Sequence, residues 1–229
     1  QLYHICGAIA PETYIKEIIR SGAILEKETS AEAAIVTIRR PDIAVAENGP
    51  DAQKSAALLK KFHNEICPAF IKAGAVIISC DRETVSAAFG SPLERLVAQK
   101  IQKAQKLPRG AAKPEMNPVN SAVKAVKTLF KKASSAEELY AGIDYGECVF
   151  SYTPLTRYGA AGSAVFRSRV LSTVARRNKA AALISKTASE KIDSELFRGG
   201  LPFDTLNGEN TPDSASSGSE LYYQLILPE

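Results

Sequence analysis

Cysteine and histidine, the residue types best suited to hold a transition metal, are scarce and scattered in this sequence. The chain contains Cys6, Cys67, Cys80, Cys148, His4 and His63. No two cysteines form a CxxC pair, so no Cys/His metal cluster can be read from the spacing. With 229 residues, the chain is also too long to need a disulfide framework. We therefore expect four buried or inert thiols in a reducing compartment, and an exposed His63.

Basic residues are concentrated in one stretch. Residues 99–132 hold nine lysines or arginines and one acidic residue, a net charge of +8, whereas the whole chain carries +4. A solvated charged helix is the simplest interpretation. Contact with an anionic membrane surface is an alternative. No RNP, KH or helix-turn-helix pattern supports specific nucleic-acid binding.

A second group of basic residues lies further along the chain. It comprises Arg157, Arg167, Arg169, Arg176 and Arg177. These arginines could form a phosphate-binding strip, but a solvated helix face is the simpler interpretation.

The elements that must position such residues follow from composition and periodicity. Hydrophobic residues make up 45% of the chain and charged residues 24%, as in ordinary globular proteins. No run of about eighteen apolar residues could span a bilayer. Helical spacing predicts helices at 11–25, 51–73, 119–132, 164–178 and 187–192. Short apolar runs predict strands at 33–38, 75–79, 85–89, 138–143, 147–152, 181–185 and 221–227. This alternation predicts an α+β fold with a mixed or antiparallel sheet.

Six segments, in chain order, resemble motifs of one family. They are APETYIKEIIRSGAIL, AAIVTIRRPDIA, AGAVIISCDRETVSAAFGSPLE, YAGIDYGECVFSY, RYGAAGSAVFRSRVLSTVARRNKAAALISKTASEKI and SGSELYYQLIL. Together they resemble the catalytic domain of class III nucleotidyl cyclases, the adenylate and guanylate cyclases. The resemblance implies a ferredoxin-like βαββαβ core with extra strands. It also implies a lead-in helix and linker at 1–30 and a cyclase-homology domain at 31–229, with a basic insertion at about 93–118.

The resemblance also implies where an active site would lie. In this family, two aspartates bind Mg²⁺ or Mn²⁺, and their positions fall on Thr37 and Glu83. The purine-reading lysine falls on Ser79, and its acidic or threonine partner on Ser163. The asparagine and arginine that stabilise the transition state fall on Phe166 and Val170. Asp81 and Asp42 are out of register, although Asp81 could reach the same face of the hairpin.

These replacements remove the chemistry that the family uses. A threonine hydroxyl carries no charge for a divalent metal, which prefers carboxylate oxygens, and phenylalanine donates no hydrogen bond. Arg167 and Arg169 lie near the arginine position, but Arg169 points roughly 100° away from it on a helix, and neither is an easy replacement. Simpler interpretations are a solvated turn for Glu83, a β-branched strand residue for Thr37 and a helix N-cap for Ser163. Tyr222 and Tyr223 are expected to pack the last strand.

The sequence therefore predicts a cyclase-homology domain with a retained scaffold and an emptied site. We expect a regulatory or dimerisation module in cyclic-nucleotide signalling, paired with itself or another cyclase-type domain and needing no metal cofactor. An active adenylate cyclase with a divergent metal site and a nucleotide-binding sensor of ATP or GTP remain the alternatives. Since the first residue is not Met, we expect the cytoplasmic part of a longer, membrane-anchored chain.

Overall fold

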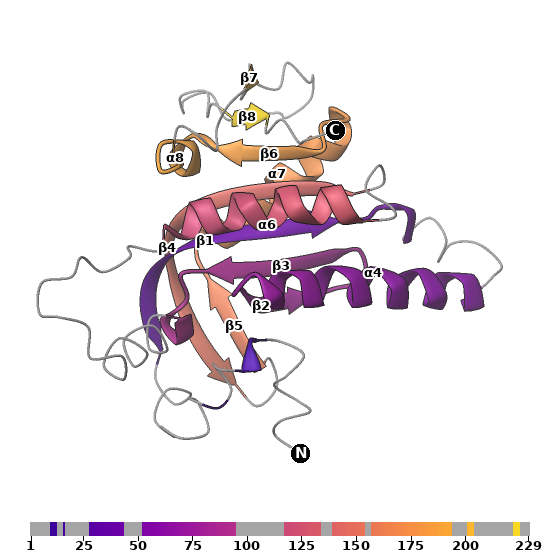
Figure 1. Ribbon diagram of the computed structural model, residues 1–229, viewed down its shortest axis with the longest axis horizontal. Coiled ribbons are helices and arrows are strands. Elements are labelled where there is room, and N and C mark those ends of the chain that lie inside the picture. Colours follow the sequence, from indigo (N-terminus) through magenta and orange to yellow (C-terminus); the bar gives the residue numbers. More distant parts are fainter. Residues whose placement is uncertain are drawn as a thin grey trace, which may run out of the picture.

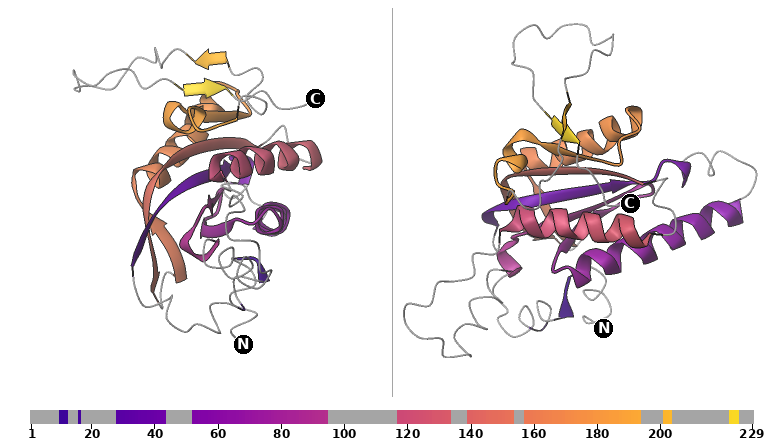
Figure 2. Two further views of the ribbon diagram at one scale, coloured as in Figure 1. Left: turned by 60° about the vertical axis from the view of Figure 1, so that its left-hand side comes forward. Right: turned by 45° about the horizontal axis from the view of Figure 1, so that its top comes forward.

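The computed structural model describes residues 10–12, 16, 28–43, 52–94, 117–133, 139–153, 157–193, 201–203 and 222–224. Most of the lead-in helix predicted at 11–25 and most of the basic insertion at 93–118 lie outside the described residues. In the described part, a curved sheet is flanked by helices on its two faces (Figures 1 and 2).

Within the described residues, eight strands form the sheet. They are β1 (Thr29–Arg39), β2 (Val76–Cys80), β3 (Thr84–Phe89), β4 (Tyr140–Thr153), β5 (Arg157–Ala161), β6 (Ala182–Ser185), β7 (Leu201–Phe203) and β8 (Tyr222–Gln224). Their order is β2-β3-β1-β4-β6-β8-β7, and β5 pairs with β4. The pairs among β2, β3, β1 and β4 are antiparallel, whereas β6 runs parallel to β4. The predicted mixed sheet is therefore confirmed.

The ferredoxin-like core is confirmed by the first four strands and two helices. Helix α4 (Ala52–Lys72) connects β1 to β2, and α6 (Pro118–Lys132) connects β3 to β4. Their apolar sides pack on one face of the sheet in a single cluster that includes Phe62, Phe70 and Val123. Helix α6 begins at Pro118 because Asn117 caps it, its side chain accepting from the backbone N–H groups of Val119 and Asn120.

Helices α7 (Ser163–Arg177) and α8 (Lys186–Ser189) lie later in the chain. Helix α7 packs on the opposite face of the sheet, against β4 and β1, and α8 follows β6. The close approach of α7 requires glycine at position 142 of β4. A Cβ atom there would lie 2.1 Å from the Ser168 carbonyl oxygen and 2.5 Å from the Ser172 nitrogen. This contact fixes α7 above the centre of the sheet.

The break predicted between the strands at 138–143 and 147–152 is wrong. Residues 140–153 form one continuous strand, β4, in place of the two predicted strands. Aspartate and glycine both favour turns. Here Asp144 is fully buried and bonded to Arg167 and Ser185, while Gly146 pairs with Ala33 of β1. Tertiary partners therefore override the local turn signal.

No helix within the described ranges combines the length and hydropathy needed to cross a membrane. Tyr223 packs against the main apolar cluster as predicted. The side chain of Tyr222 lies outside the described residues.

Candidate functional site

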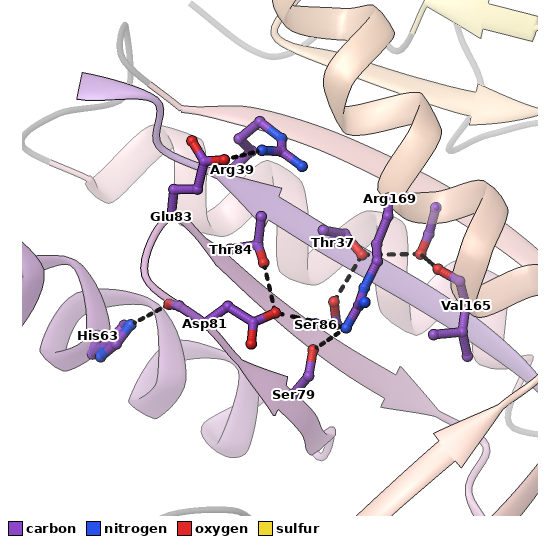
Figure 3. A network of polar contacts seen from close by, with 11 residues as sticks. Thr37, Arg39, His63, Ser79, Asp81, Glu83, Thr84, Ser86, Val165 and Arg169 are labelled. Carbon is purple, nitrogen blue, oxygen red and sulfur yellow. Dashed lines mark hydrogen bonds and ion pairs between the residues drawn. The ribbon is translucent and has the colours of Figure 1, made fainter. Parts of the chain in front are cut away.

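A chain of buried hydroxyl groups surrounds Thr37, which lies in the middle of β1. Its Oγ1 atom is 2.9 Å from Ser86 Oγ on β3 and 2.9 Å from Ser168 Oγ on α7, and all three residues are fully buried (Figure 3). Ser168 donates its single hydroxyl proton to the Val165 carbonyl oxygen at 3.0 Å. Ser168 must therefore accept from Thr37, and Thr37 must accept from Ser86. Each of the three hydroxyl protons has an acceptor, and this group of hydroxyls carries no net charge.

Glu83 follows β2 in the turn before β3. Its carboxylate accepts a 2.6 Å charge-assisted hydrogen bond from Arg39 Nη1, and its backbone oxygen accepts from Arg40 N at 2.8 Å. Arg39 also extends toward Ser172 on α7, with Nε 3.4 Å from Oγ. Glu83 is thus engaged in an ion pair and not simply solvated, which corrects the simpler expectation for this residue. Figure 3 shows its carboxylate turned toward Arg39, away from Thr37.

Arg169 extends from α7 across the sheet to the end of β2. Its Nη2 atom donates to Ser79 Oγ at 2.8 Å and lies 3.7 Å from Asp81 Oδ2 (Figure 3). Thr84 also donates to Asp81 Oδ2, at 3.2 Å. The Nε atom of Arg169 is buried and has no hydrogen-bond partner in the described part of the chain. A guanidinium group thus lies among the hairpin residues, a placement that helix spacing did not predict.

Arg167, two residues before Arg169 on α7, has different partners. Its Nε donates to Asp144 Oδ2 at 2.6 Å, and Ser185 donates to the other carboxylate oxygen. The solvated helix face predicted for the arginines is therefore wrong for Arg167 and Arg169. It holds for Arg176 and Arg177, which are exposed at the end of α7, while the side chain of Arg157 lies outside the described residues.

The remaining predicted site positions share one side of α7. Ser163 is exposed, Val170 is half-buried against the small cluster around Leu171, and Phe166 is 68% exposed. Ser163 is the first residue of the helix, and the N-cap is Gly162, so the predicted Ser163 cap is wrong. Gly162 adopts a φ of 152°, which a residue with a side chain rarely adopts, and a Cβ atom there would lie 2.7 Å from the Glu147 carbonyl oxygen.

The fold brings some of the predicted residues together and separates others. Ser79, Asp81 and Arg169 meet at the end of β2, whereas Glu83 pairs with Arg39, and Asp42 pairs with Arg40. Asp42 thus takes no part in the site. No group of three or more histidine, cysteine, aspartate or glutamate residues suited to a metal ion occurs among the described residues.

Sequence reasoning missed the hydroxyl partners Ser86 and Ser168. A weak signal existed for Ser168, since it lies between the apolar Ala164 and Leu171 on the buried side of its helix. The partner of a buried serine cannot be read from its own helix, because it comes from a strand far away in the chain.

Comparison with solved structures identifies the fold. A bacterial light-regulated adenylyl cyclase is similar with a TM-score of 0.65 and 10% identity, over 94% of this chain and 58% of the other. The dimeric guanylyl cyclase domain of a RhoGC fusion protein from the aquatic fungus Blastocladiella emersonii has a TM-score of 0.61 and 12% identity, over 87% of this chain and 98% of that domain. This chain has the nucleotidyl cyclase fold. The guanylate cyclase domain of RhGC from Catenaria anguillulae, in complex with GTP, shares this cyclase fold with a TM-score of 0.60 and 12% identity, over 89% and 100% of the two chains.

The cyclase fold was predicted from six weak motifs, and the structural comparison confirms it. The sequence itself matches no protein-family model and no curated protein. The chain spans little more than half the length of the light-regulated cyclase. At these identities the likeness concerns the fold, and the chemistry of the site must be argued from this chain's own residues.

Proposed function

We propose that this chain is a cyclase-homology domain of cyclic-nucleotide signalling that has lost catalysis and acts as a regulatory or dimerisation module. The observation that carries the proposal is the guanidinium group of Arg169 between Ser79 and Asp81. It lies at the hairpin where the family resemblance would have a purine-reading lysine and a metal-binding carboxylate.

The residues present do not fit a two-metal site. Phosphoryl chemistry of this kind needs metal ions to activate the attacking hydroxyl and to neutralise the triphosphate. Thr37 offers an uncharged oxygen inside a completed hydrogen-bond chain, and the Glu83 carboxylate is already paired with Arg39. No step of the reaction can be assigned to these groups.

Arg169 adds electrostatic repulsion to this loss of ligands. Two unit charges 4 Å apart interact by about 4 kcal/mol at the effective dielectric constant of a protein surface, and a divalent cation doubles this figure. Arg169 also competes for the Asp81 carboxylate, the one acidic group of the hairpin that could otherwise replace the lost ligand. A resident Mg²⁺ or Mn²⁺ is therefore not expected.

Two kinds of partner are proposed for this domain. Dimerisation with a second copy or with another cyclase-type domain is supported by Phe166, a large apolar side chain that is 68% exposed on α7. Contact with an anionic membrane surface is supported by the charge of residues 99–132. We further propose a cytoplasmic domain of a longer, membrane-anchored chain.

A nucleotide-binding sensor is the second candidate function. The unpartnered Nε of Arg169 favours it, because a buried N–H donor without a partner is costly and a phosphate oxygen could satisfy it. In that case ATP or GTP would raise the melting temperature without any product being formed.

The decisive experiment measures cyclase activity with Mn²⁺ and either ATP or GTP, in the wild type and in Glu83→Ala. We expect no cyclic nucleotide above background from either protein. Turnover by the wild type that Glu83→Ala abolishes would contradict the proposal and establish an active cyclase with a divergent metal site.

Calorimetry with Mn²⁺ tests the role assigned to Arg169. Arg169→Ala should bind Mn²⁺ more tightly than the wild type, because it frees Asp81 and removes a positive charge. Arg176→Ala, which removes an exposed arginine at the end of the same helix, is the matched control and should leave the affinity unchanged. Equal affinities in all three proteins would show that Arg169 does not exclude the cation.

A further inference from the structure

Two cysteines that are separated in the sequence and form no motif lie next to each other in the fold. Cys67 is half-buried on α4, and Cys80 is the exposed last residue of β2. Both are free thiols. Cys80 pairs with Val85 of β3, and Val85 belongs to the apolar cluster against which Cys67 packs, so the two thiols lie on the same face of the sheet. The pair lies outside the hydroxyl chain of Thr37 and outside the ion pairs described above.

The packing of α4 on β2 holds the two thiols together. His63, one helical turn before Cys67 and on the same side of α4, lies with Nε2 2.9 Å from the Asp81 carbonyl oxygen (Figure 3). This contact anchors α4 against the residue that follows Cys80. Pro68 lies inside the helix directly after Cys67 and removes one backbone hydrogen bond from that turn. The helix can therefore adjust most easily where a bond between the two sulfurs would require it.

We propose that Cys67 and Cys80 form a redox pair, which closes into an intramolecular disulfide when a hydroperoxide oxidises Cys80. This assignment corrects the expectation of four inert or buried thiols. It does not depend on the proposed function, because it follows from the packing of α4 on β2 and the contact of His63 with Asp81.

The environments of the two thiols give them different reactivity. The hydrogen bond from Cys67, with the charge of His63, lowers the pKa of Cys80 to about 7, against the opposing effects of burial and Asp81. The hydrogen bond with Cys80 and burial raise the pKa of Cys67 above its usual range. Near neutral pH, Cys80 is thus the thiolate and the nucleophile, and Cys67 stays protonated.

The reaction balances with one hydroperoxide. The Cys80 thiolate attacks the peroxide, the O–O bond breaks, and the products are a Cys80 sulfenic acid and an alkoxide or hydroxide that takes a proton from water. The Cys67 sulfur then displaces the sulfenic hydroxyl, which leaves with the Cys67 proton as water. Two electrons pass from the two sulfurs to the peroxide. Oxidation of Cys80 also removes the negative charge that keeps Cys67 protonated, and this favours the second step.

The disulfide would connect α4 to the strand that carries the partners of Arg169. Cys80 lies between Ser79 and Asp81, and both contact that arginine. In a reducing compartment such a bond would be transient, as is typical of redox-sensing cysteines.

The test treats the full chain, in a Cys6→Ser background, with hydrogen peroxide at neutral pH. The remaining thiols are then alkylated, and the peptides are mapped without reduction. We expect the Cys67 and Cys80 peptides joined within one chain. Cys148 is buried and burial raises its pKa to about 11, so it should resist the peroxide and be alkylated once the chain is denatured. Cys67 and Cys80 recovered in separate peptides, or joined between chains, would overturn the proposal.

Two variants make the assignment of roles testable. In Cys67→Ser, Cys80 should stop at the sulfenic acid, which dimedone traps, and the pH midpoint of its alkylation should rise from about 7 because the hydrogen bond is lost. In Cys80→Ser, Cys67 should remain a free thiol after the same treatment. A sulfenic acid on Cys67 in that variant, or an unchanged midpoint in Cys67→Ser, would contradict the roles. Circular dichroism on each variant checks that the chain is folded.

Discussion

Arg167 on α7 donates a 2.6 Å charge-assisted hydrogen bond to Asp144 on β4, and this carboxylate is completely buried. Ser185 on β6 donates to the second carboxylate oxygen. One acidic group thus joins a helix and two parallel strands directly below the start of α7. Burying a charge is favourable only when partners of this kind surround it. We therefore assign Asp144 a structural role in holding α7 above the sheet.

Asp144→Asn should destabilise the fold. Removing one partner of a buried ion pair typically costs about 3 to 5 kcal/mol, and the exposure of Arg167, at 31%, reduces our expectation to about 2 to 4 kcal/mol. Urea unfolding measures the free energy. Glu190→Gln, which neutralises an exposed carboxylate, is the matched control and should change stability by less than about 0.5 kcal/mol. Equal effects of the two substitutions would show that the buried pair contributes nothing specific.

Thr37→Val should test the hydroxyl chain in the centre of the sheet. The substitution keeps the shape of the side chain but leaves the Ser86 proton without its acceptor, at a cost of about 1 to 3 kcal/mol. Thermal unfolding measures the loss. Thr128→Val removes an exposed hydroxyl that bonds within α6, and it should change the melting temperature little. A Thr37→Val protein as stable as the wild type would show that the buried hydroxyl groups do not contribute to stability.

Tyr158→Phe should stabilise the protein. The Tyr158 hydroxyl is buried without a hydrogen-bond partner among the described residues, while its ring stacks on Phe150 with centroids 5.9 Å apart. Phenylalanine keeps the stacking and removes the unsatisfied group, a gain of about 1 kcal/mol. The variant is compared with Tyr140→Phe, a half-buried tyrosine on β4. A loss of stability in Tyr158→Phe would mean that its hydroxyl does have a partner.

The same variant has a predicted pH dependence. Burial raises the pKa of Tyr158 above its ordinary value of 10.0. A raised folded-state pKa means that the unfolded chain ionises first as the pH rises. Wild-type stability should therefore fall above pH 10 relative to Tyr158→Phe, and the difference should be constant below it. Unfolding curves from pH 8 to pH 11 measure this difference, and parallel curves over the whole range would contradict the prediction.

Phe166→Asp should weaken self-association if α7 forms part of the proposed dimer interface. A charge in place of an apolar side chain that is 68% exposed in the single chain should raise the dissociation constant at least tenfold. Sedimentation velocity over a concentration series measures it. Thr128→Asp, an exposed position on α6, controls for added charge. A wild type that stays monomeric at every concentration, or equal weakening by both substitutions, would argue against this interface.

The arrangement of the site was predictable only in part. Thr37, Glu83 and Ser79 fall on β1, the hairpin turn and β2, because strand periodicity and turn residues are local signals. The reach of Arg169 to Ser79 was not predictable, because it depends on how α7 is rotated on the sheet. That rotation is set by Gly142, which lets the helix backbone approach, and by the Asp144–Arg167 pair.

The sequence by itself determined the order of the strands and helices of the βαββαβ core, the cyclase fold, and the replacement of most of the family's site residues. These properties depend on residue type and on spacing along the chain. The tertiary structure decided which separated residues meet: Arg169 with Ser79, Thr37 with Ser168, and Cys67 with Cys80. Such pairs arise from packing a helix on a sheet. Packing depends on the shapes of both surfaces at once, and no single stretch of sequence carries that information.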